Sequence, residues 1–285
     1  MIRRLVLGGV AAAAAYGVAR GVGRLLATRA TPALRARMDR TNHAGRTVSL
    51  SEGPATVAGL LAPAVLVPGT RARTAVALVT AVSGVLGAVD DFGESGDAKG
   101  LRGHLGALAS GHVTTGGLKV LGIPAVSLLA AGFLGGRGDS VPTRALDLVA
   151  GGGVIAGTAN LLNLLDLRPG RALKATLVLL VLTGGRNAPG GPHGAETSAV
   201  LTGALLGTVA ALVPDDLAGA TMLGDTGANA LGAVLGTRLA LDSDTRGRLL
   251  ALGVLAGLTL ASEKVSFTRV IENTPGLREL DAWGR

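Results

Sequence analysis

The sequence predicts an all-α fold, a polytopic membrane-embedded helical bundle of about nine transmembrane helices. Of its 285 residues, 48% are hydrophobic and 16% are charged, against roughly 25% charged in soluble domains. Apolar runs that approach the ~20 residues of a spanning helix recur along the chain. Aromatic residues make up only 2% and there are 46 glycines, a composition typical of helices that pack through small residues in lipid.

Nine apolar segments are expected to form the spans, namely 3–26, 52–69, 73–90, 115–135, 143–165, 171–185, 196–213, 226–241 and 246–263. The sixth and eighth are the shortest. No soluble domain fits between the segments, so we expect one transmembrane domain over 1–263 and a cytoplasmic tail over 264–285. The first segment follows two arginines and lacks a small-residue cleavage site, which favours a retained span over a signal peptide.

Pairs of glycines four residues apart predict close helix contacts. They are Gly17/Gly21, Gly203/Gly207, Gly232/Gly236 and Gly253/Gly257.

The net charge of +8 indicates a membrane surface rather than nucleic acid, because aromatic side chains for base stacking are almost absent. Anionic membrane lipids are the expected partners of the basic clusters. Loops on the side of the tail hold 14 Lys and Arg residues, against 9 on the other side. The positive-inside rule therefore predicts that the tail side is cytoplasmic. Without cysteine, the chain has no disulfides, thiolate metal sites or cysteine nucleophiles.

Three polar residues follow one another at helical spacing at the end of the fifth segment. Asn160, Asn163 and Asp166 are three apart, so on a helix they share one face. Carboxylate and amide oxygens on one face suit Mg²⁺, a hard cation that takes oxygen ligands. Helix capping and polar packing between helices remain the alternative.

Adjacent carboxylates close the third segment. Asp90 and Asp91 repel each other, so at least one must gain from a cation or a proton. A site for a metal and a diphosphate would supply that cation. An exposed acidic helix end is the alternative.

A third polar group opens the eighth segment. The glycines of Gly224-Asp225-Thr226-Gly227 allow close approach of a ligand, and the N-terminus of the following helix attracts phosphate. Asp and Thr are also good helix N-caps, so simple capping is the alternative.

These three motifs, in this order, resemble the polyprenyl-phosphate N-acetylhexosamine-1-phosphate transferase family, which includes the phospho-N-acetylmuramoyl-pentapeptide translocase. Residues 90–92 resemble its Asp-Asp-aromatic motif and residues 160–166 its Asn-x-x-Asn-x-x-Asp motif. Residues 223–232 resemble its Met-Gly-Asp-Thr-Gly-Ser-x-x-Leu-Gly motif, and 46–54 loosely match its Pro-Thr-x-Gly-Gly loop. The likeness covers about 40–245.

The resemblance implies an Mg²⁺-dependent enzyme, with Mn²⁺ as an alternative metal, on the cytoplasmic face of the plasma membrane. Such enzymes transfer a sugar-1-phosphate from a UDP-sugar to polyprenyl phosphate and release UMP, a step of cell-wall biogenesis. By motif match, Asn163 and Asp225 would hold the metal. Asp90 or Asp91 would orient or deprotonate the lipid phosphate, and Asp166 would assist metal and nucleotide binding. Asn160, Gly224 and Thr226 fall within the substrate-binding motifs, and a homodimer is left open.

The chain also departs from the family pattern. The family often has a second carboxylate at the position of Pro169, and a His-rich motif where residues 263–275 stand. Arg168 and Arg171, beside Pro169, could replace these groups by binding a substrate phosphate, or could serve only as topology signals. The departures also leave open a non-catalytic relative that binds lipid-linked precursors or an envelope partner. An unrelated transporter is the third reading.

Overall fold

A computed structural model describes residues 1–42, 45–93, 106, 110–111, 114–184 and 191–284. This part of the chain is almost entirely helical, with one two-stranded antiparallel hairpin. The elements are α1 (Ile2–Arg29), α2 (Pro32–Met38), β1 (Asp39–Thr41), β2 (Thr47–Ser49), α3 (Glu52–Leu61), η1 (Ala62–Leu66), α4 (Thr70–Phe92), α6 (Thr115–Leu134), α7 (Val141–Leu165), α8 (Arg171–Leu182), α9 (Gly191–Leu217), α10 (Gly224–Asp242), α11 (Thr245–Ser262), α12 (Phe267–Asn273) and α13 (Leu277–Ala282).

The count of nine spans is not confirmed. Among the described residues, α1, α4, α6, α7 and α9 are long and apolar enough to cross a membrane, and a sixth span results if the bent pair α11–α12 is counted as one. The segment predicted at 171–185 forms only the 12 residues of α8. At 1.5 Å per residue, such a helix covers about 18 Å of the ~30 Å hydrocarbon core. The segment predicted at 52–69 is likewise split into the short elements α3 and η1.

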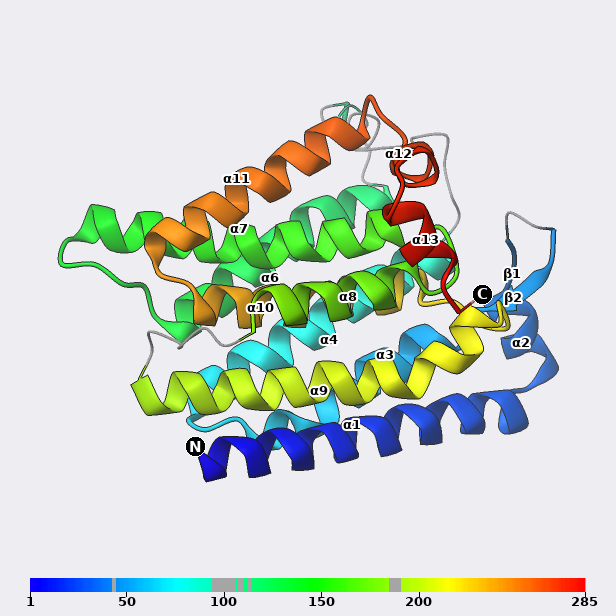
Figure 1. Cartoon of the computed structure of the whole chain (residues 1–285), viewed down its shortest axis with the longest axis horizontal. Helices are drawn as coiled ribbons and strands as arrows, with labels where there is room; N and C mark the ends of the chain where they lie inside the picture. The colour runs from blue at the N-terminus through cyan, green and yellow to red at the C-terminus, as the bar shows by residue number, and fades with distance from the viewer. Residues whose placement is uncertain (43–44, 94–105, 107–109, 112–113, 185–190, 285) are drawn as a thin grey trace.

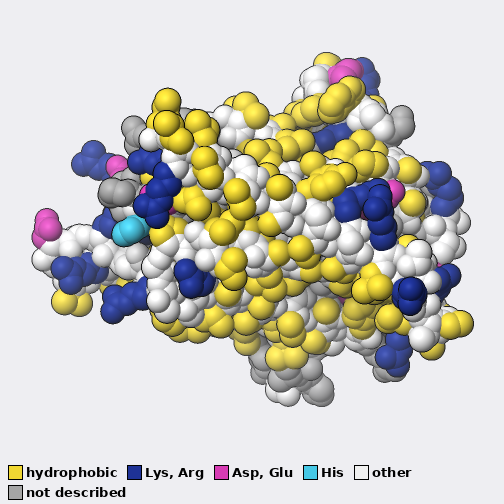
Figure 2. Space-filling model, turned by 90° about the horizontal axis from the view of Figure 1, so that it is seen from below, with side chains coloured by type: hydrophobic (Ala, Val, Ile, Leu, Met, Phe, Trp, Pro, Cys, Tyr) yellow, Lys and Arg dark blue, Asp and Glu magenta, His cyan; other side chains and the backbone are white. Residues whose placement is uncertain are grey.

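The long helices lie side by side with their axes roughly aligned, and the hairpin, α2 and the C-terminus gather at one end (Figure 1). We call this the hairpin end. Figure 2 shows hydrophobic side chains over most of the middle of one face, with Lys and Arg mainly toward its two ends. That distribution is typical of a protein whose middle lies in lipid. Most of the loop at 91–114 and residues 185–190 lie outside the described residues.

Helix α10 lies at the centre of the bundle and packs against α7, α4, α3 and α9. All but two of its 19 residues are buried, so protein rather than lipid surrounds it. A Cβ on Gly232 would come within 2.5 Å of the Cα of Ala159, and one on Gly236 within 2.7 Å of the Cα of Ile155. These two glycines therefore let α10 approach the backbone of α7 closely.

The glycine pairs are confirmed in two cases and wrong in two. Gly203 and Gly207 meet the backbone of α1 at Gly8 and Ala12, as predicted for a helix contact. The pairs Gly17/Gly21 and Gly253/Gly257 have nothing within 4 Å of their Cβ positions. Glycine spacing alone does not say which helix face is turned toward a neighbour.

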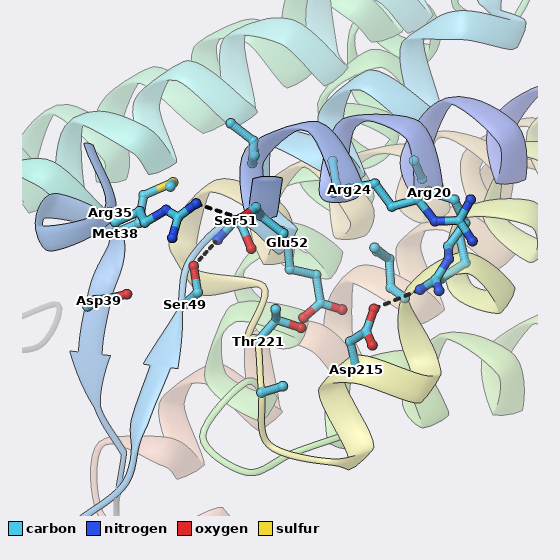
Figure 3. Close-up of a pocket in the computed structure, with 18 residues that line it drawn as sticks. Arg20, Arg24, Arg35, Met38, Asp39, Ser49, Ser51, Glu52, Asp215 and Thr221 are labelled. Carbon is cyan, nitrogen blue, oxygen red and sulfur yellow. Dashed lines mark hydrogen bonds and ion pairs between the residues drawn. The ribbon is translucent and has the colours of Figure 1, made fainter. Parts of the chain in front are cut away.

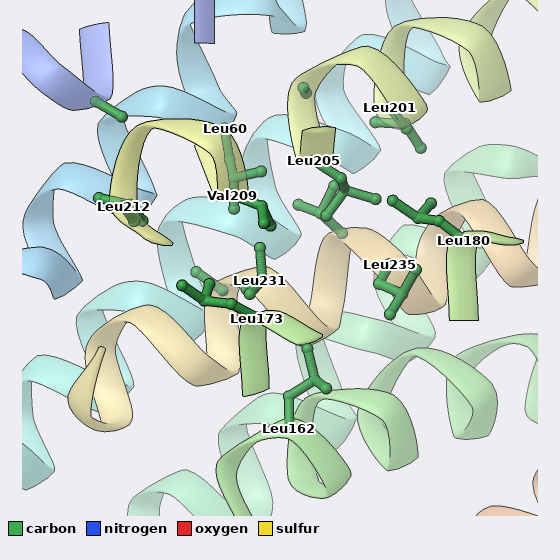
Figure 4. Packing of buried hydrophobic residues seen from close by; sticks show 14 of the residues in the cluster. Leu60, Leu162, Leu173, Leu180, Leu201, Leu205, Val209, Leu212, Leu231 and Leu235 are labelled. Atoms are coloured by element: carbon green, nitrogen blue, oxygen red, sulfur yellow. The ribbon is translucent and has the colours of Figure 1, made fainter. Parts of the chain in front are cut away.

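Aliphatic side chains fill the interior, and the largest fully buried ones are Leu, Ile and Val. Leu173, Leu205 and Leu231 come from α8, α9 and α10 and meet in one cluster (Figure 4). Helix starts follow local capping: the side chains of Thr114, Ser140 and Asp244 accept hydrogen bonds from the first turns of α6, α7 and α11.

Buried charges tie the helices together at the end opposite the hairpin. Arg248 of α11 lies 2.6 Å from the carboxylate of Asp147 in α7, and both side chains are almost fully buried. Arg137 donates its backbone N–H to the same carboxylate, at 2.8 Å. Because each charge has a partner, this network fixes α7 and α11 to each other without an unpaired buried ion.

Candidate functional site

The main candidate site is a pocket of about 690 Å³ at the hairpin end, where α4 and α7 finish and α10 begins. Its lining combines acids, amides and arginines that are far apart in sequence. They are Asp91, Asn163, Asp166 and Asp225, together with Arg40, Arg46 and Arg168, and Gly224 also lines it. The three predicted motifs therefore meet at one end of the bundle.

The motifs meet because carboxylates from two helices cap the N-terminus of α10. Asp91 accepts the backbone N–H groups of Asp225 at 3.0 Å and Thr226 at 2.8 Å, and the Thr226 hydroxyl at 2.6 Å. The backbone N–H of Gly224 donates to Asp166. Negative groups at a helix N-terminus are stabilised by the helix dipole and by the unpaired N–H groups. The protein itself thus supplies the anion expected at the start of α10.

Gly224 makes this capping possible. Its φ of +60° lies in the left-handed region, which favours glycine. A Cβ there would stand 2.9 Å from a carboxylate oxygen of Asp91. Gly224 therefore contributes by adopting this backbone conformation and by leaving room for the carboxylate of Asp91.

Asp90 and Asp225 share a cation that belongs to the protein. The ammonium of Lys119, in α6, lies 2.6 Å from Asp90 and also forms an ion pair with Asp225. Thr115 donates its hydroxyl to Asp90 at 2.9 Å. Asp90 does not line the pocket, whereas Asp91 and Asp225 do. The cation predicted for the Asp90-Asp91 pair is thus supplied to Asp90 by a lysine.

Two oxygen atoms at the end of α7 are buried without a hydrogen-bond partner among the described residues. They are Oδ1 of Asn163 and Oδ2 of Asp166. Burial raises the pKa of Asp166 well above its usual range, and the negative charge of nearby Asp216 raises it further. Buried acceptors of this kind cost free energy unless a cation, a proton or a donor satisfies them.

The donor set is compatible with Mg²⁺. Asn163 and Asp225 offer an amide oxygen and a carboxylate on the same pocket, and the amide oxygen of Asn163 and one carboxylate oxygen of Asp166 are unsatisfied among the described residues. The described residues hold no group of three or more acidic or histidine side chains in metal-binding geometry. Mg²⁺ does not require such a cage, because it keeps several waters and uses one or two carboxylates together with substrate phosphates.

The two predicted arginines have different surroundings. Arg168 lines the pocket and contacts Glu272 of α12 at 3.3 Å. Arg171 is buried and binds both carboxylate oxygens of Asp281 in α13, at 2.8 and 3.1 Å, as well as the Thr268 hydroxyl. A guanidinium engaged on both edges by the tail is not available to a phosphate. In this structure, Arg171 docks the tail rather than lining the pocket.

Asn160 and Thr226 also lie outside the pocket lining. The amide of Asn160 donates to the Thr259 hydroxyl at 3.0 Å and so connects α7 to α11. Asn160 lines a neighbouring groove of about 430 Å³, which runs between α6, α7 and α11 and shares Asn163 and Leu164 with the pocket. One part of this groove is apolar, with Val120, Ile123, Pro124 and Ala156. Thr226 donates its backbone N–H and its hydroxyl to Asp91, as described above.

Sequence reasoning missed Lys119 and Arg40. Lys119 is a charged residue inside an apolar segment, and such a residue is by itself a signal of a functional or paired site in a membrane protein. Arg40 lies in β1, lines the pocket and donates to the backbone carbonyl of Asp91. Nothing in the local sequence separates Arg40 from the other arginines of that loop, so only the fold identifies it.

The two arginines allow a paired prediction. Arg168→Gln should raise the KM for a phosphorylated substrate about ten-fold, the loss of roughly one charge-assisted hydrogen bond, with the tail still docked. Arg171→Gln should leave KM near wild type but release residues 264–284, measured as faster hydrogen exchange there. If Arg171→Gln raises KM while the tail keeps its protection, our assignment of Arg171 is wrong.

The chain matches no protein-family model and no curated protein sequence. The fold and the site define a helical bundle whose long apolar helices could span a membrane, with a pocket of acidic and basic side chains at one end.

Proposed function

We propose that this protein transfers a sugar-1-phosphate from a UDP-sugar to a polyprenyl phosphate at the cytoplasmic face of the plasma membrane, releasing UMP. The observation that carries the proposal is the convergence of three distant polar motifs on one pocket that adjoins a partly apolar groove. A polar pocket suits a nucleotide diphosphate, and an apolar groove suits a prenyl chain. The two cavities share Asn163 and Leu164, where a lipid phosphate would meet the diphosphate.

Each side chain has a role that follows from its position. Arg40, Arg46 and Arg168 line the pocket and would bind the phosphates of the UDP-sugar, since guanidinium groups match phosphate oxygens. Asp91 is a positioning residue, because it holds the first turn of α10 and with it Asp225. Lys119 lines the groove, while its partner Asp225 lines the pocket, so the pair stands at their junction.

Asn163 and Asp225 would hold Mg²⁺. When bound, the metal neutralises the diphosphate and stabilises the charge on the departing UMP. A phosphate monoester acceptor is largely ionised near neutral pH. The residues of the chain therefore need mainly to orient it rather than to remove a proton.

One observation favours a second candidate, a non-catalytic relative that binds lipid-linked precursors. Lys119 already pairs with both Asp90 and Asp225, so the chain itself places a cation beside these carboxylates without a metal. A site with its own cation can bind a phosphorylated lipid without turning it over.

Purified full-length protein in detergent would distinguish the two candidates. It would be given undecaprenyl phosphate, Mg²⁺ and a panel of UDP-sugars, with UMP release and lipid-linked product measured together. The proposal expects Mg²⁺-dependent UMP release with at least one UDP-sugar, abolished by EDTA. If no product forms with any sugar while undecaprenyl phosphate binds saturably, the enzyme proposal is wrong and the non-catalytic lipid-binding protein is supported.

A further inference from the structure

A second cavity at the hairpin end lies on the other side of β2 from the candidate site. It has a volume of about 410 Å³ and lies between the last turns of α1, α2, the start of α3 and the end of α9. At the end of β2 and in the turn that follows it, Ser49 and Ser51 line this cavity, while Leu50 lines the candidate site. The two cavities are therefore separate and share no lining residue.

Three arginines from α1 and α2 line the cavity (Figure 3). Arg20 is satisfied by Asp215 at 2.7 Å and by the Ala211 carbonyl at 3.0 Å. Arg35 donates to the Ala27 carbonyl at 2.9 Å but has no carboxylate partner among the described residues, and the guanidinium of Arg24 has neither a hydrogen bond nor an ion pair among them. Within the described part of the chain, the guanidinium of Arg24 and the remaining N–H groups of Arg35 are thus free to bind an anion.

The same cavity holds a carboxylate without a cation. Glu52, at the start of α3, is only 2% exposed, and neither of its carboxylate oxygens makes a hydrogen bond of good geometry among the described residues. Figure 3 shows this carboxylate between the Thr221 hydroxyl and Asp215. Thr221 is a neutral donor, and Asp215 is itself an acid. A buried carboxylate in such surroundings lacks the positive partner that would stabilise its charged form.

The pair of arginines and the buried carboxylate together suit a ligand that carries both a negative and a positive charge. A simple phosphate would satisfy Arg24 and Arg35 but would leave Glu52 without a cation, and a simple amine would do the reverse. Asp39, at the exposed start of β1, is the remaining acid in the lining. Primary ammonium groups donate up to three hydrogen bonds, which suits a buried carboxylate beside a hydroxyl.

We propose that this cavity binds a phosphate ester carrying a primary amine, the chemistry of a phosphoethanolamine headgroup, with the phosphate on Arg24 and Arg35 and the ammonium on Glu52. One source is a membrane lipid, because α1 is a candidate span with mostly exposed sides and the cavity also has apolar lining at Ala19, Leu26 and Leu212. The other is a soluble phosphoethanolamine ester. The binding is independent of the proposed transferase reaction.

The test is lipid retention by the full-length protein, measured by mass spectrometry of intact complexes in detergent. Equal amounts of dioleoyl phosphatidylethanolamine and dioleoyl phosphatidylcholine are offered, since choline lacks the N–H donors that Glu52 would accept. Wild type should retain the ethanolamine lipid about ten-fold better, the scale of one hydrogen bond to a charged group. Glu52→Gln should abolish this preference, and the double variant Arg24→Gln/Arg35→Gln should weaken retention of both lipids.

Arg29→Gln is the matched control, since Arg29 ends α1 but does not line the cavity. Displacement of the lipid by O-phosphoethanolamine would show that the headgroup alone is recognised, whereas retention of the ethanolamine lipid against it would assign the ligand to the lipid. Equal retention of both lipids by wild type would overturn the proposal. So would unchanged retention in Arg24→Gln/Arg35→Gln, whose exposed positions leave folding intact even if Glu52→Gln unfolds.

Discussion

Asp225→Asn should lower UMP release by at least about 100-fold, the scale at which a lost electrostatic partner of the reacting groups is felt. Asp225 lines the candidate pocket, pairs with Lys119 and lies in the first turn of the helix that Asp91 caps. The substitution removes its charge but keeps the shape of the side chain, and the capping bonds go to its backbone rather than to its carboxylate. The measurement is initial-rate UMP release by variant protein that elutes as wild type in size-exclusion chromatography.

Asp139→Asn is the control for this variant. Asp139 is an exposed acid in the loop before α7, outside the pocket lining, so its rate should match wild type. Asp166→Asn should lose less activity than Asp225→Asn if Asn163 and Asp225 hold the metal. Full turnover in Asp225→Asn would remove Asp225 from the reaction and leave it the role of a paired residue in the first turn of α10.

Gly87→Ala should destabilise the protein and inactivate it together. A Cβ on Gly87 would stand 2.2 Å from the backbone carbonyl oxygen of Asp225 and 2.6 Å from the backbone nitrogen of Thr226. Backbone cannot rotate away as a side chain can, so α4 and α10 must separate. Overpacking of this kind costs about 1–3 kcal/mol of folding stability. The separation also weakens the bonds from Asp91 to α10, and with them the placement of Asp225.

Thermal unfolding in detergent and UMP release would be followed on the same preparation. Gly17→Ala is the matched control, because nothing lies within 4 Å of its Cβ position. Alanine is the better helix former, so this variant should be unchanged or slightly more stable. If Gly87→Ala unfolds at the wild-type temperature with full activity, the close approach of α4 and α10 is not required.

The sequence was sufficient for the all-α fold and for most helices. The apolar runs correspond to helices in the structure because any backbone in lipid must satisfy its own hydrogen bonds. The three polar motifs were also recognisable as a set, since acids and amides are costly inside apolar segments and therefore stand out. The meeting of Asp91, Asn163, Asp166 and Asp225 at one pocket follows the same logic, because these motifs close or open segments at the same end of the bundle.

Only the tertiary structure decided which partner each polar group takes. Lys119 pairs with Asp90 and Asp225, Asp91 caps α10, and Arg171 holds the tail, all across separations of tens to more than a hundred residues. The burial of α10 on every side was equally hidden. The local sequence pattern determines which segments are apolar and where helices begin and end. The pairing of charges depends on which helix faces meet, and that is fixed by packing over the whole bundle.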